Sequence, residues 1–232
     1  MKKILLLAFM VMFIGIIAPC KVYAVDISVG ATTWYTWWEI ETHDGDKFNF
    51  DPGFMYGPTM SVEFNDDFNL TFLYLYGKFD LNYSPFPVTF KRRDLDIALN
   101  YRLNGFFKLF GGIKYMSYTY SIADWVDFDH SCIGPGLGLS ASFPMSENLF
   151  ILANISYMYL WGDQEDGTDK ISFKGYGINS SVLIAYYIVP ASTVISLGGR
   201  SQYYVTDYDN SDVIGKYKFY GITLTATYNF SI

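Results

Sequence analysis

The sequence has little charge and almost no cysteine or histidine, and these shortages exclude several classes of protein. Of the 232 residues 17% are charged, two are Cys and two are His. Low charge beside 51% hydrophobic residues excludes a disordered chain and a coiled-coil rod. Lys and Arg number 16 against 23 Asp and Glu. Nucleic-acid binding needs a concentrated cationic face, so we expect no nucleic-acid partner.

The N-terminus has the pattern of an export signal. Two lysines precede an uncharged apolar run over residues 4–18, and Ala24 is the small residue that a signal peptidase needs before its cut. The run is shorter than the roughly 20 residues of a membrane helix. Lipidation at Cys20 is a weaker alternative because a proline precedes it. We predict a signal peptide over 1–24 and one mature domain over 25–232.

Removal of the signal peptide changes the charge and the thiol content. Three lysines and no acid leave with residues 1–24, which takes the net charge from −7 to −10. Cys132 is then the one remaining cysteine, so the mature chain has no intrachain disulfide and no thiolate zinc site. We expect Cys132 to be a buried thiol, and we expect no metal and no cofactor.

A two-residue alternation runs through the mature chain. Over 133–143 one parity carries mainly large apolar residues, and the other carries only Gly and Ser; over 221–232 apolar residues alternate with Gly, Thr and Asn. This period is that of a β-strand with two unlike faces. The pattern predicts an all-β chain with candidate strands at 26–40, 54–64, 69–81, 92–103, 106–120, 132–143, 149–161, 172–188, 193–205 and 217–231.

The connections between these strands alternate in length. Tight turns are predicted around Asn65, Asn104, Ser146 and Pro190, and long loops over 41–53, 82–91, 121–131, 162–171 and 206–216. Most of the strands exceed the roughly 9 to 11 residues that cross a bilayer at a tilt. Short turns at one end, long loops at the other and an even strand number are typical of transmembrane barrels. We predict an antiparallel up-and-down transmembrane β-barrel of about ten strands, with eight as the alternative and both termini periplasmic.

The composition of the weaker face indicates which side faces out. A soluble, lipocalin-like binder would place its apolar face inside and carry Lys and Glu outside. Here the weaker face carries small residues, which suit a crowded interior, so we place the apolar face against lipid. Aromatic residues near the long loops predict an upper girdle: Trp34, Trp37, Trp38, Trp125, Trp161, Tyr115, Tyr118, Tyr120, Tyr157, Tyr159, Tyr203, Tyr204, Tyr217 and Tyr220. Phe64, Phe68, Phe106, Phe107, Phe143 and Phe230 predict a lower belt.

The end of the chain carries an alternating hydrophobic pattern in Tyr228, Phe230 and Ile232. With this pattern the mature chain resembles small bacterial outer-membrane β-barrels such as the OmpA membrane domain, OmpX, OmpW and the omptins. The resemblance implies that these three residues form an assembly signal, although such signals end in an aromatic residue rather than Ile. It also implies a multi-pass protein of the outer membrane. Its partners would be outer-membrane lipid, lipopolysaccharide and, during insertion, the barrel-assembly machinery; an extracellular partner is not identified.

Charged residues of both signs fall on the face predicted to line the lumen. A small barrel encloses little space, so these groups are expected to pair across it. One interpretation is a narrow polar conduit, and the other is a lumen plugged by ion pairs. The predicted lumen network consists of Glu63, Asp94, Asp96, Arg102, Lys108, Lys114 and Arg200.

The predicted loops carry clustered charges. Lys91, Arg92 and Arg93 form a basic cluster that either contacts lipid phosphates or marks a rim. Carboxylates could bind a divalent cation, although their spacing is not that of a dedicated calcium loop and solvation is the favoured interpretation. The possible cation site consists of Asp163, Glu165, Asp166 and Asp169.

The two histidines of the mature chain, His43 and His130, each lie beside acids in a predicted loop. A His oriented by Asp could activate water or Ser131. The spacing differs from that of the omptins and of barrel-type lipid A deacylases, so we expect no enzyme. We expect a structural or surface-interaction barrel or a narrow passive channel. The alternatives are OmpW-like transport of small or apolar solutes, an enzyme acting on lipid A or peptides, and a soluble binder.

Overall fold

The computed structural model describes residues 25–42, 44–83, 86–122, 126–167, 169–209 and 214–231, with no side-chain description for 82, 83, 86, 87, 121, 122, 126 and 127. The predicted signal peptide therefore lies outside the described residues. No helix within the described ranges is long and apolar enough to cross a membrane.

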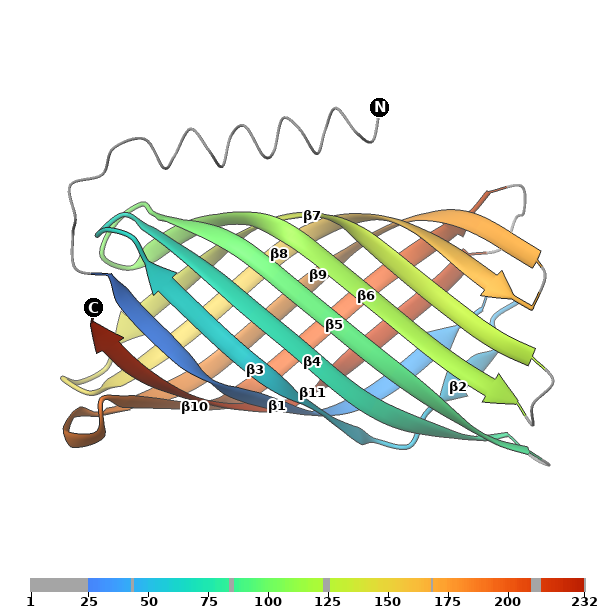
Figure 1. Cartoon of the computed structure of the whole chain (residues 1–232), viewed down its shortest axis with the longest axis horizontal. Helices are drawn as coiled ribbons and strands as arrows, with labels where there is room; N and C mark the ends of the chain where they lie inside the picture. Colours follow the sequence, from blue (N-terminus) through green and yellow to red (C-terminus); the bar gives the residue numbers. More distant parts are fainter. Residues whose placement is uncertain are drawn as a thin grey trace.

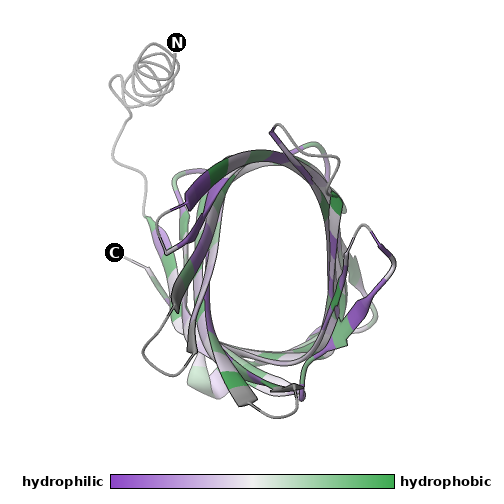
Figure 2. Ribbon diagram, turned by 90° about the vertical axis from the view of Figure 1, so that its right-hand side faces the viewer, coloured by the Kyte–Doolittle hydropathy of each residue, from purple (hydrophilic) through white to green (hydrophobic). Residues whose placement is uncertain are grey.

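Ten strands close into an antiparallel barrel in which each strand pairs with the next one along the chain. The last strand pairs with the first, and the short β2 (Lys47–Asn49) pairs only with the end of β1 (Figure 1). The end-on view shows the closed ring (Figure 2). The prediction of a ten-stranded up-and-down barrel is confirmed. The barrel strands are β1 (Asp26–Glu41), β3 (Gly53–Glu63), β4 (Phe68–Tyr83), β5 (Phe86–Arg102), β6 (Phe107–Ile122), β7 (Val126–Pro144), β8 (Leu149–Asp166), β9 (Asp169–Ile188), β10 (Thr193–Tyr208) and β11 (Ile214–Ser231).

Both ends of the described chain and the tight turns lie at one end of the barrel, which we name the turn end (Figure 1, left). Asn65 closes the first turn because its Oδ1 accepts the backbone N–H groups of Asp67 and Phe68, each at 2.9 Å. Asn104 closes the second turn in the same way. The predicted tight turns at these two positions are confirmed, and local side-chain chemistry explains them.

At the opposite end, which we name the loop end, the strands continue through most of the predicted loops. β7 begins at Val126, β8 ends at Asp166 and β9 begins at Asp169, so the expected long loops over 121–131 and 162–171 are wrong. These segments are polar at about every second residue, a composition that exposed loops share. The structure shows instead that they are strands whose polar residues face outward.

The two faces of the wall exchange their character along the barrel. Near the turn end, large apolar residues such as Leu137 and Ile222 are exposed outside. Near the loop end, outward positions carry exposed charges such as Asp129 and Lys174, and inward positions carry buried aromatic rings such as Phe173. The predicted apolar exterior is therefore correct for the part of the barrel near the turn end, the turn-end section, and wrong for the part near the loop end, the loop-end section. Each strand keeps its alternation along its whole length, but in the loop-end section the apolar residues lie on the inward parity and the polar residues on the outward parity.

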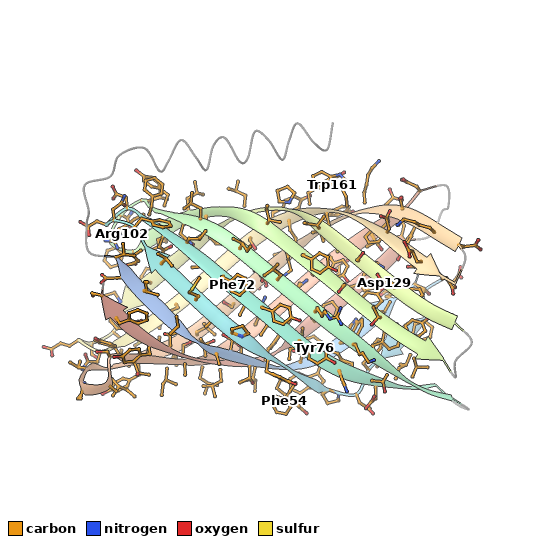
Figure 3. The ribbon with its side chains drawn as sticks, viewed as in Figure 1. Phe54, Phe72, Tyr76, Arg102, Asp129 and Trp161 are labelled. Carbon is orange, nitrogen blue, oxygen red and sulfur yellow. The ribbon has the colours of Figure 1, made fainter. Side chains whose placement is uncertain are left out.

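Outward aromatic residues mark the level at which this exchange occurs. Trp37 stacks on Tyr220 with ring centroids 5.8 Å apart, and Trp161 stands on the outside of β8 (Figure 3). This level is the boundary between the turn-end section and the loop-end section. Part of the predicted girdle is wrong, and Trp125 lies outside the described residues. The predicted girdle residues that instead lie inside the barrel are the buried Trp34, Trp38, Tyr118, Tyr204 and Tyr217 and the half-buried Tyr120.

Aromatic residues also gather outside at the turn end. Phe106 stacks on Phe143 with centroids 6.0 Å apart, and Phe64 is exposed as well. At the end of the last strand Tyr228 stacks on Phe230, and both residues lie in the seam between β11 and β1. Ile232, the final residue of the predicted assembly signal, lies outside the described residues.

Candidate functional site

Charged side chains from three strands meet inside the barrel at about mid-height. Residues 92, 94 and 96 share one parity of β5 and face inward, and Lys114 of β6 is the register partner of Asp96. Arg200 reaches the same point from β10, which lies far from β5 in the strand order. We name Arg92, Asp94, Asp96, Lys114 and Arg200 the central ion network.

Arg92 and Asp94 form the most buried pair of this network. The Nε and Nη2 groups of Arg92 donate to the two carboxylate oxygens of Asp94, each at 2.8 Å, and both side chains are 2% exposed. Nη2 also donates to Oε1 of Gln202 at 3.3 Å, and the guanidinium carbon lies 3.4 Å from the centroid of the Phe219 ring. A two-pronged geometry of this kind fixes both side chains in place.

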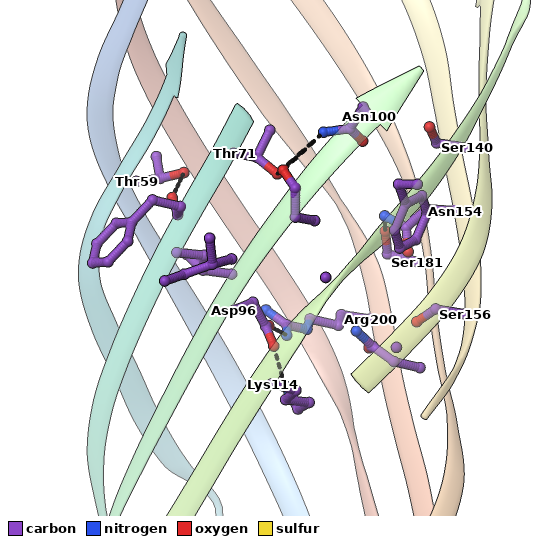
Figure 4. Close-up of a pocket in the computed structure, with 18 of the residues that line it drawn as sticks. Thr59, Thr71, Asp96, Asn100, Lys114, Ser140, Asn154, Ser156, Ser181 and Arg200 are labelled. Carbon is purple, nitrogen blue, oxygen red and sulfur yellow. Dashed lines mark hydrogen bonds and ion pairs between the residues drawn. The ribbon is translucent and has the colours of Figure 1, made fainter. Parts of the chain in front are cut away.

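Asp96 connects this pair to the far wall. Lys114 Nζ lies 2.7 Å from Asp96 Oδ1 and 3.8 Å from Asp94 Oδ2. Arg200 Nη2 reaches the other oxygen of Asp96 at 3.2 Å (Figure 4). The Arg200 guanidinium also lies over the Trp34 ring at 4.8 Å. The network therefore spans the lumen from β5 to β10.

The structure divides the predicted lumen charges into three groups. Asp94, Asp96, Lys114 and Arg200 come together as described. Glu63 and Lys108 form a separate pair nearer the turn end, with 3.9 Å between charged atoms and side chains that are 39% and 32% exposed.

Arg102 is half-buried and has no ion pair among the described residues. Arg92 was predicted to contact lipid phosphates or to mark a rim together with Lys91 and Arg93, and both interpretations are wrong for it because it is buried inside the barrel. It lies two residues before Asp94 and therefore on the same inward face of β5. The sequence contains this spacing, but the flanking cations Lys91 and Arg93 make the run resemble an exposed basic cluster. Lys91 and Arg93 are exposed outside.

A polar cavity of about 370 Å³ lies on the turn-end side of the network (Figure 4). Asp96, Lys114 and Arg200 form part of its wall, and small hydroxyl and amide side chains supply much of the rest. Asn154 Nδ2 donates to Ser181 Oγ at 2.8 Å across this wall. The small polar residues of the lining are Thr32, Thr59, Thr71, Asn100, Ser140, Asn154, Ser156, Asn179, Ser181, Ser196, Thr223 and Thr225.

A second cavity, of about 470 Å³, lies in the loop-end section and has a different chemistry. Its lining comes from nine of the ten barrel strands together with residues around β2, and among the described residues it contains no charged side chain. We name it the aromatic cavity. The lining residues are Ile40, Thr42, Phe48, Phe50, Leu81, Phe90, Tyr118, Tyr120, Phe128, Gln164, Ile171, Tyr208, Ile214, Gly215 and Tyr217.

A packed aromatic layer separates the aromatic cavity from the central ion network. Trp38 lies flat on Phe50 with centroids 4.0 Å apart, and it meets the edges of Phe79 and Phe90 at 5.3 and 5.4 Å. Phe219 lies 5.1 Å from Trp38 and also contacts Arg92. Stacked and edge-on rings at these distances are favourable beyond their burial alone.

His130 belongs to this aromatic interior rather than to a loop. Its ring lies between those of Tyr118 and Phe173, each at 4.4 Å, and it is 1% exposed. The exterior at this level is polar, with Asp129 and Ser131 on either side. Burial lowers the pKa of His130 to about 3, and the Gln164 side chain opposes this shift only in part. The predicted loop position of His130 is wrong, and His43 lies outside the described residues.

Lys170 lies at the predicted loop cation site. Its Nζ lies 2.6 Å from Glu165 Oε1 and 3.3 Å from Asp163 Oδ2, and these hydrogen bonds raise the pKa of Lys170. Asp166 and Asp169 are exposed register partners at the hairpin end. Within the described ranges no group of three or more Asp, Glu, His or Cys residues could hold a metal ion. Two of the four predicted cation ligands, Asp163 and Glu165, are therefore paired with the ammonium group of Lys170.

Cys132 is free and buried among the described residues.

Comparison with known proteins supports the fold. No protein-family model and no curated protein sequence matches this chain. Among solved structures, the barrel is similar to the outer membrane protease OmpT from Escherichia coli, at 9% identity, with 90% of this chain and 99% of that chain covered and a TM-score of 0.64. The chain has the fold of an outer-membrane β-barrel.

Two other matches have lower scores. The β domain of the Bordetella autotransporter BrkA matches at 10% identity over 87% of this chain and 98% of that chain, with a TM-score of 0.46. The Ail protein of Yersinia pestis matches at 12% identity over 88% and 99%, with a TM-score of 0.41. The similarity to OmpT, at 9% identity, concerns the fold and not the chemistry of a site.

Proposed function

We propose that this chain spans the bacterial outer membrane with its turn-end section in lipid and its loop-end section projecting into the outside medium. The apolar exterior of the first section and the outward charges of the second support this placement. Arg93 and Lys174 are exposed just beyond the outward aromatic residues, where lipopolysaccharide phosphates would lie. Lipid and lipopolysaccharide are thus the proposed constant partners, with the assembly machinery acting during insertion.

Fractionation of the cell envelope tests this placement. We expect the full-length protein in the outer-membrane fraction, with an electrophoretic mobility that changes on boiling, as intact barrels show. Recovery of the mature chain from the periplasm as a soluble monomer without detergent would support the lipocalin-like alternative instead.

Within the membrane, the proposed role is that of a closed, non-enzymatic barrel that presents its loop-end section at the cell surface. The central ion network carries this proposal because it spans the lumen and leaves the two cavities on opposite sides. Above it the rings around Trp38 add a second, apolar barrier. A hydrated ion would have to break buried ion pairs and then cross a layer of packed rings, both of which are costly.

Planar-bilayer recording tests closure. We expect no steady unitary steps from the refolded protein. A variant with Asp96→Ala, Arg200→Ala and Trp38→Ala removes the ion pair that crosses the lumen and the central ring of the aromatic layer, and we expect it to conduct if it refolds. A matched variant with Arg93→Ala, Asp129→Ala and Trp37→Ala changes outward residues on strands β5, β7 and β1 and should stay silent. Steady steps from the unchanged protein would refute closure without any appeal to variants.

A second candidate function is passage of small apolar solutes. The aromatic cavity favours it, since that cavity would accept such a solute from outside. This function requires the ring layer and the ion network to open. Uptake of a labelled apolar solute by cells that produce the protein would support it, provided that the Trp38→Ala variant increases the uptake.

The absence of enzymatic activity is part of the proposal and rests on the position of His130. A ring that is 1% exposed and sandwiched between two aromatic rings cannot approach a lipid or peptide substrate. We expect no proteolysis and an unchanged lipid A profile in cells that produce the protein. Either activity, lost on replacement of His43 or His130 by Ala, would overturn this part of the proposal.

A further inference from the structure

We infer that the aromatic cavity at the loop end is a binding site for a neutral, planar aromatic small molecule. This inference rests on the proposed placement of the loop-end section outside the membrane but not on closure, because a ligand could bind there whether or not the lumen conducts. Nothing in the fold requires such a cavity. A barrel whose only task is to stay closed would be more stable with this space filled by its own side chains.

The size of the cavity suits a small ligand. Its volume of about 470 Å³ falls within the range of roughly 300–1,000 Å³ that is common for small-molecule sites. It lies in the section that projects from the membrane in the proposed placement, so a ligand could reach it without crossing lipid. The polar cavity on the other side of the ion network differs because charged side chains and many small polar groups stand among its apolar lining residues.

The lining selects for an aromatic ligand. Eight of its residues are aromatic, and several of the rings already stack on one another, such as Tyr120 on Phe128 with centroids 4.7 Å apart. Phe90 lies 4.3 Å from Tyr120, and Phe50 covers Trp38 at the floor. A flat ring inserted here would extend this stacking and remove apolar surface from water.

A short chain of polar groups crosses one side of the lining and provides orientation. Tyr118 Oη donates to Tyr217 Oη at 3.1 Å, Tyr217 and Tyr208 share a hydrogen bond of 3.1 Å, and Tyr208 Oη donates to Gln164 Oε1 at 2.8 Å. The remaining lone pairs of these phenol oxygens can accept a hydrogen bond from a ligand N–H or O–H. A few placed polar groups in an apolar pocket are typical of small-molecule sites.

The charge around the cavity disfavours an anion. None of the described residues that line it is charged, so an anionic ligand would find no cation among them to compensate its loss of water. The lysines next to lining residues in sequence, Lys47, Lys170 and Lys216, are each paired with a glutamate, so they are already compensated. The preferred ligand is therefore neutral, flat and equipped with one hydrogen-bond donor.

Indole has these properties and is soluble enough to serve as the probe. Calorimetric titration of indole into the refolded full-length protein, corrected against matched empty micelles, should show saturable binding to one site. Indole-3-acetate has the same ring with a negative charge, and we expect it to bind about tenfold more weakly or worse.

Three variants locate the site. Ile171→Trp places a large ring in the aromatic cavity and should reduce indole affinity by about tenfold or more. Ile178→Trp makes the same change on the same strand, at an exposed outward position, and should bind as the unchanged protein does. Ser181→Phe fills the polar cavity instead and should also leave binding unchanged. Each variant is first checked for boiling-dependent mobility.

The results separate the alternatives. No saturable binding beyond the empty micelles overturns the inference, as does binding that Ile171→Trp leaves intact. Loss of binding in Ser181→Phe but not in Ile171→Trp also overturns it, because the ligand would then occupy the polar cavity. If the protein conducts ions but still binds indole with the expected variant pattern, closure is refuted and the binding site stands.

Discussion

The Arg92–Asp94 pair allows the reasoning about the lumen to be tested as a free-energy measurement. Arg92→Met keeps the length of the side chain and removes its charge, so Asp94 loses the partner that donates to both of its oxygens at 2.8 Å. Asp94 would keep only Lys114 at 3.8 Å, and Lys114 is closer to Asp96. Removing one member of a buried ion pair typically costs about 3–5 kcal/mol. We expect about 3 kcal/mol here because Lys114 compensates in part.

The double variant distinguishes a buried pair from two independent contributions. Asp94→Leu alone leaves the Arg92 guanidinium buried against Phe219 and should cost a similar amount. In the double variant neither charge is left alone, so the loss should fall short of the sum of the single losses by about 2 kcal/mol or more. Arg93→Met, an exposed outward neighbour, should change stability by less than about 0.5 kcal/mol.

The assay is reversible urea unfolding of the barrel in phospholipid vesicles, followed by tryptophan fluorescence and by boiling-dependent mobility. The two probes should give the same midpoints if the transition is two-state. Additivity of the two single substitutions within about 0.5 kcal/mol would refute the paired, desolvated network. So would a loss in Arg92→Met no larger than that in Arg93→Met.

Three further predictions follow from the interior and the wall. The buried His130 has a pKa of about 3 in the folded state against an ordinary 6.5, so the unfolded state binds its proton first and stability falls as pH drops below about 6.5. At pH 5 the loss should be about 2 kcal/mol relative to pH 8. His130→Phe should remove this loss, and an unchanged pH slope in that variant would contradict the assignment. Trp38→Ala should cost about 3–5 kcal/mol in urea unfolding because the ring is buried against Phe50, while Trp37→Ala on the outer face should cost less; equal losses would argue against the inward placement. At Gly134 an added Cβ would lie 1.8 Å from the carbonyl oxygen of Tyr159, whereas at Gly136 the nearest atom is at 3.6 Å. Gly134→Ala should therefore lower the refolding yield, and Gly136→Ala should not. Equal yields would mean that β7 and β8 can separate at no cost.

The fold was accessible from the sequence because its signals are local. Alternation with a period of two defines a strand from its own residues, and Asn65 and Asn104 close their turns with hydrogen bonds that span only two or three positions. A chain of such strands joined by tight turns at one end has few arrangements besides an antiparallel barrel. Ten strands and the antiparallel order were therefore predictable without any tertiary information.

The loop-end section was not predictable in the same way, because alternation shows that a strand has two unlike faces without showing which face is inside. That choice depends on the solvent around each level of the barrel. Where lipid surrounds the barrel, the apolar residues of a strand face outward. Where water surrounds it, the apolar residues face inward, as Trp38 and Phe173 do. The sequence therefore predicts loops where strands carry outward charges, and it predicts a membrane girdle where part of an internal aromatic core lies.

The composition of the lumen was likewise determined by the sequence, but its contacts were not. Parity identified Asp94, Asp96, Lys114 and Arg200 as inward residues, while Arg92 was missed because it is flanked by two exposed cations. Only the closed barrel brings Arg200 to Asp96, 104 positions away in the chain, since this contact depends on the curvature of the whole sheet. The sequence by itself determined which residues of a strand share a face of the wall. The tertiary structure decided which of them meet across the lumen, because that distance depends on the closed ring and not on any single strand.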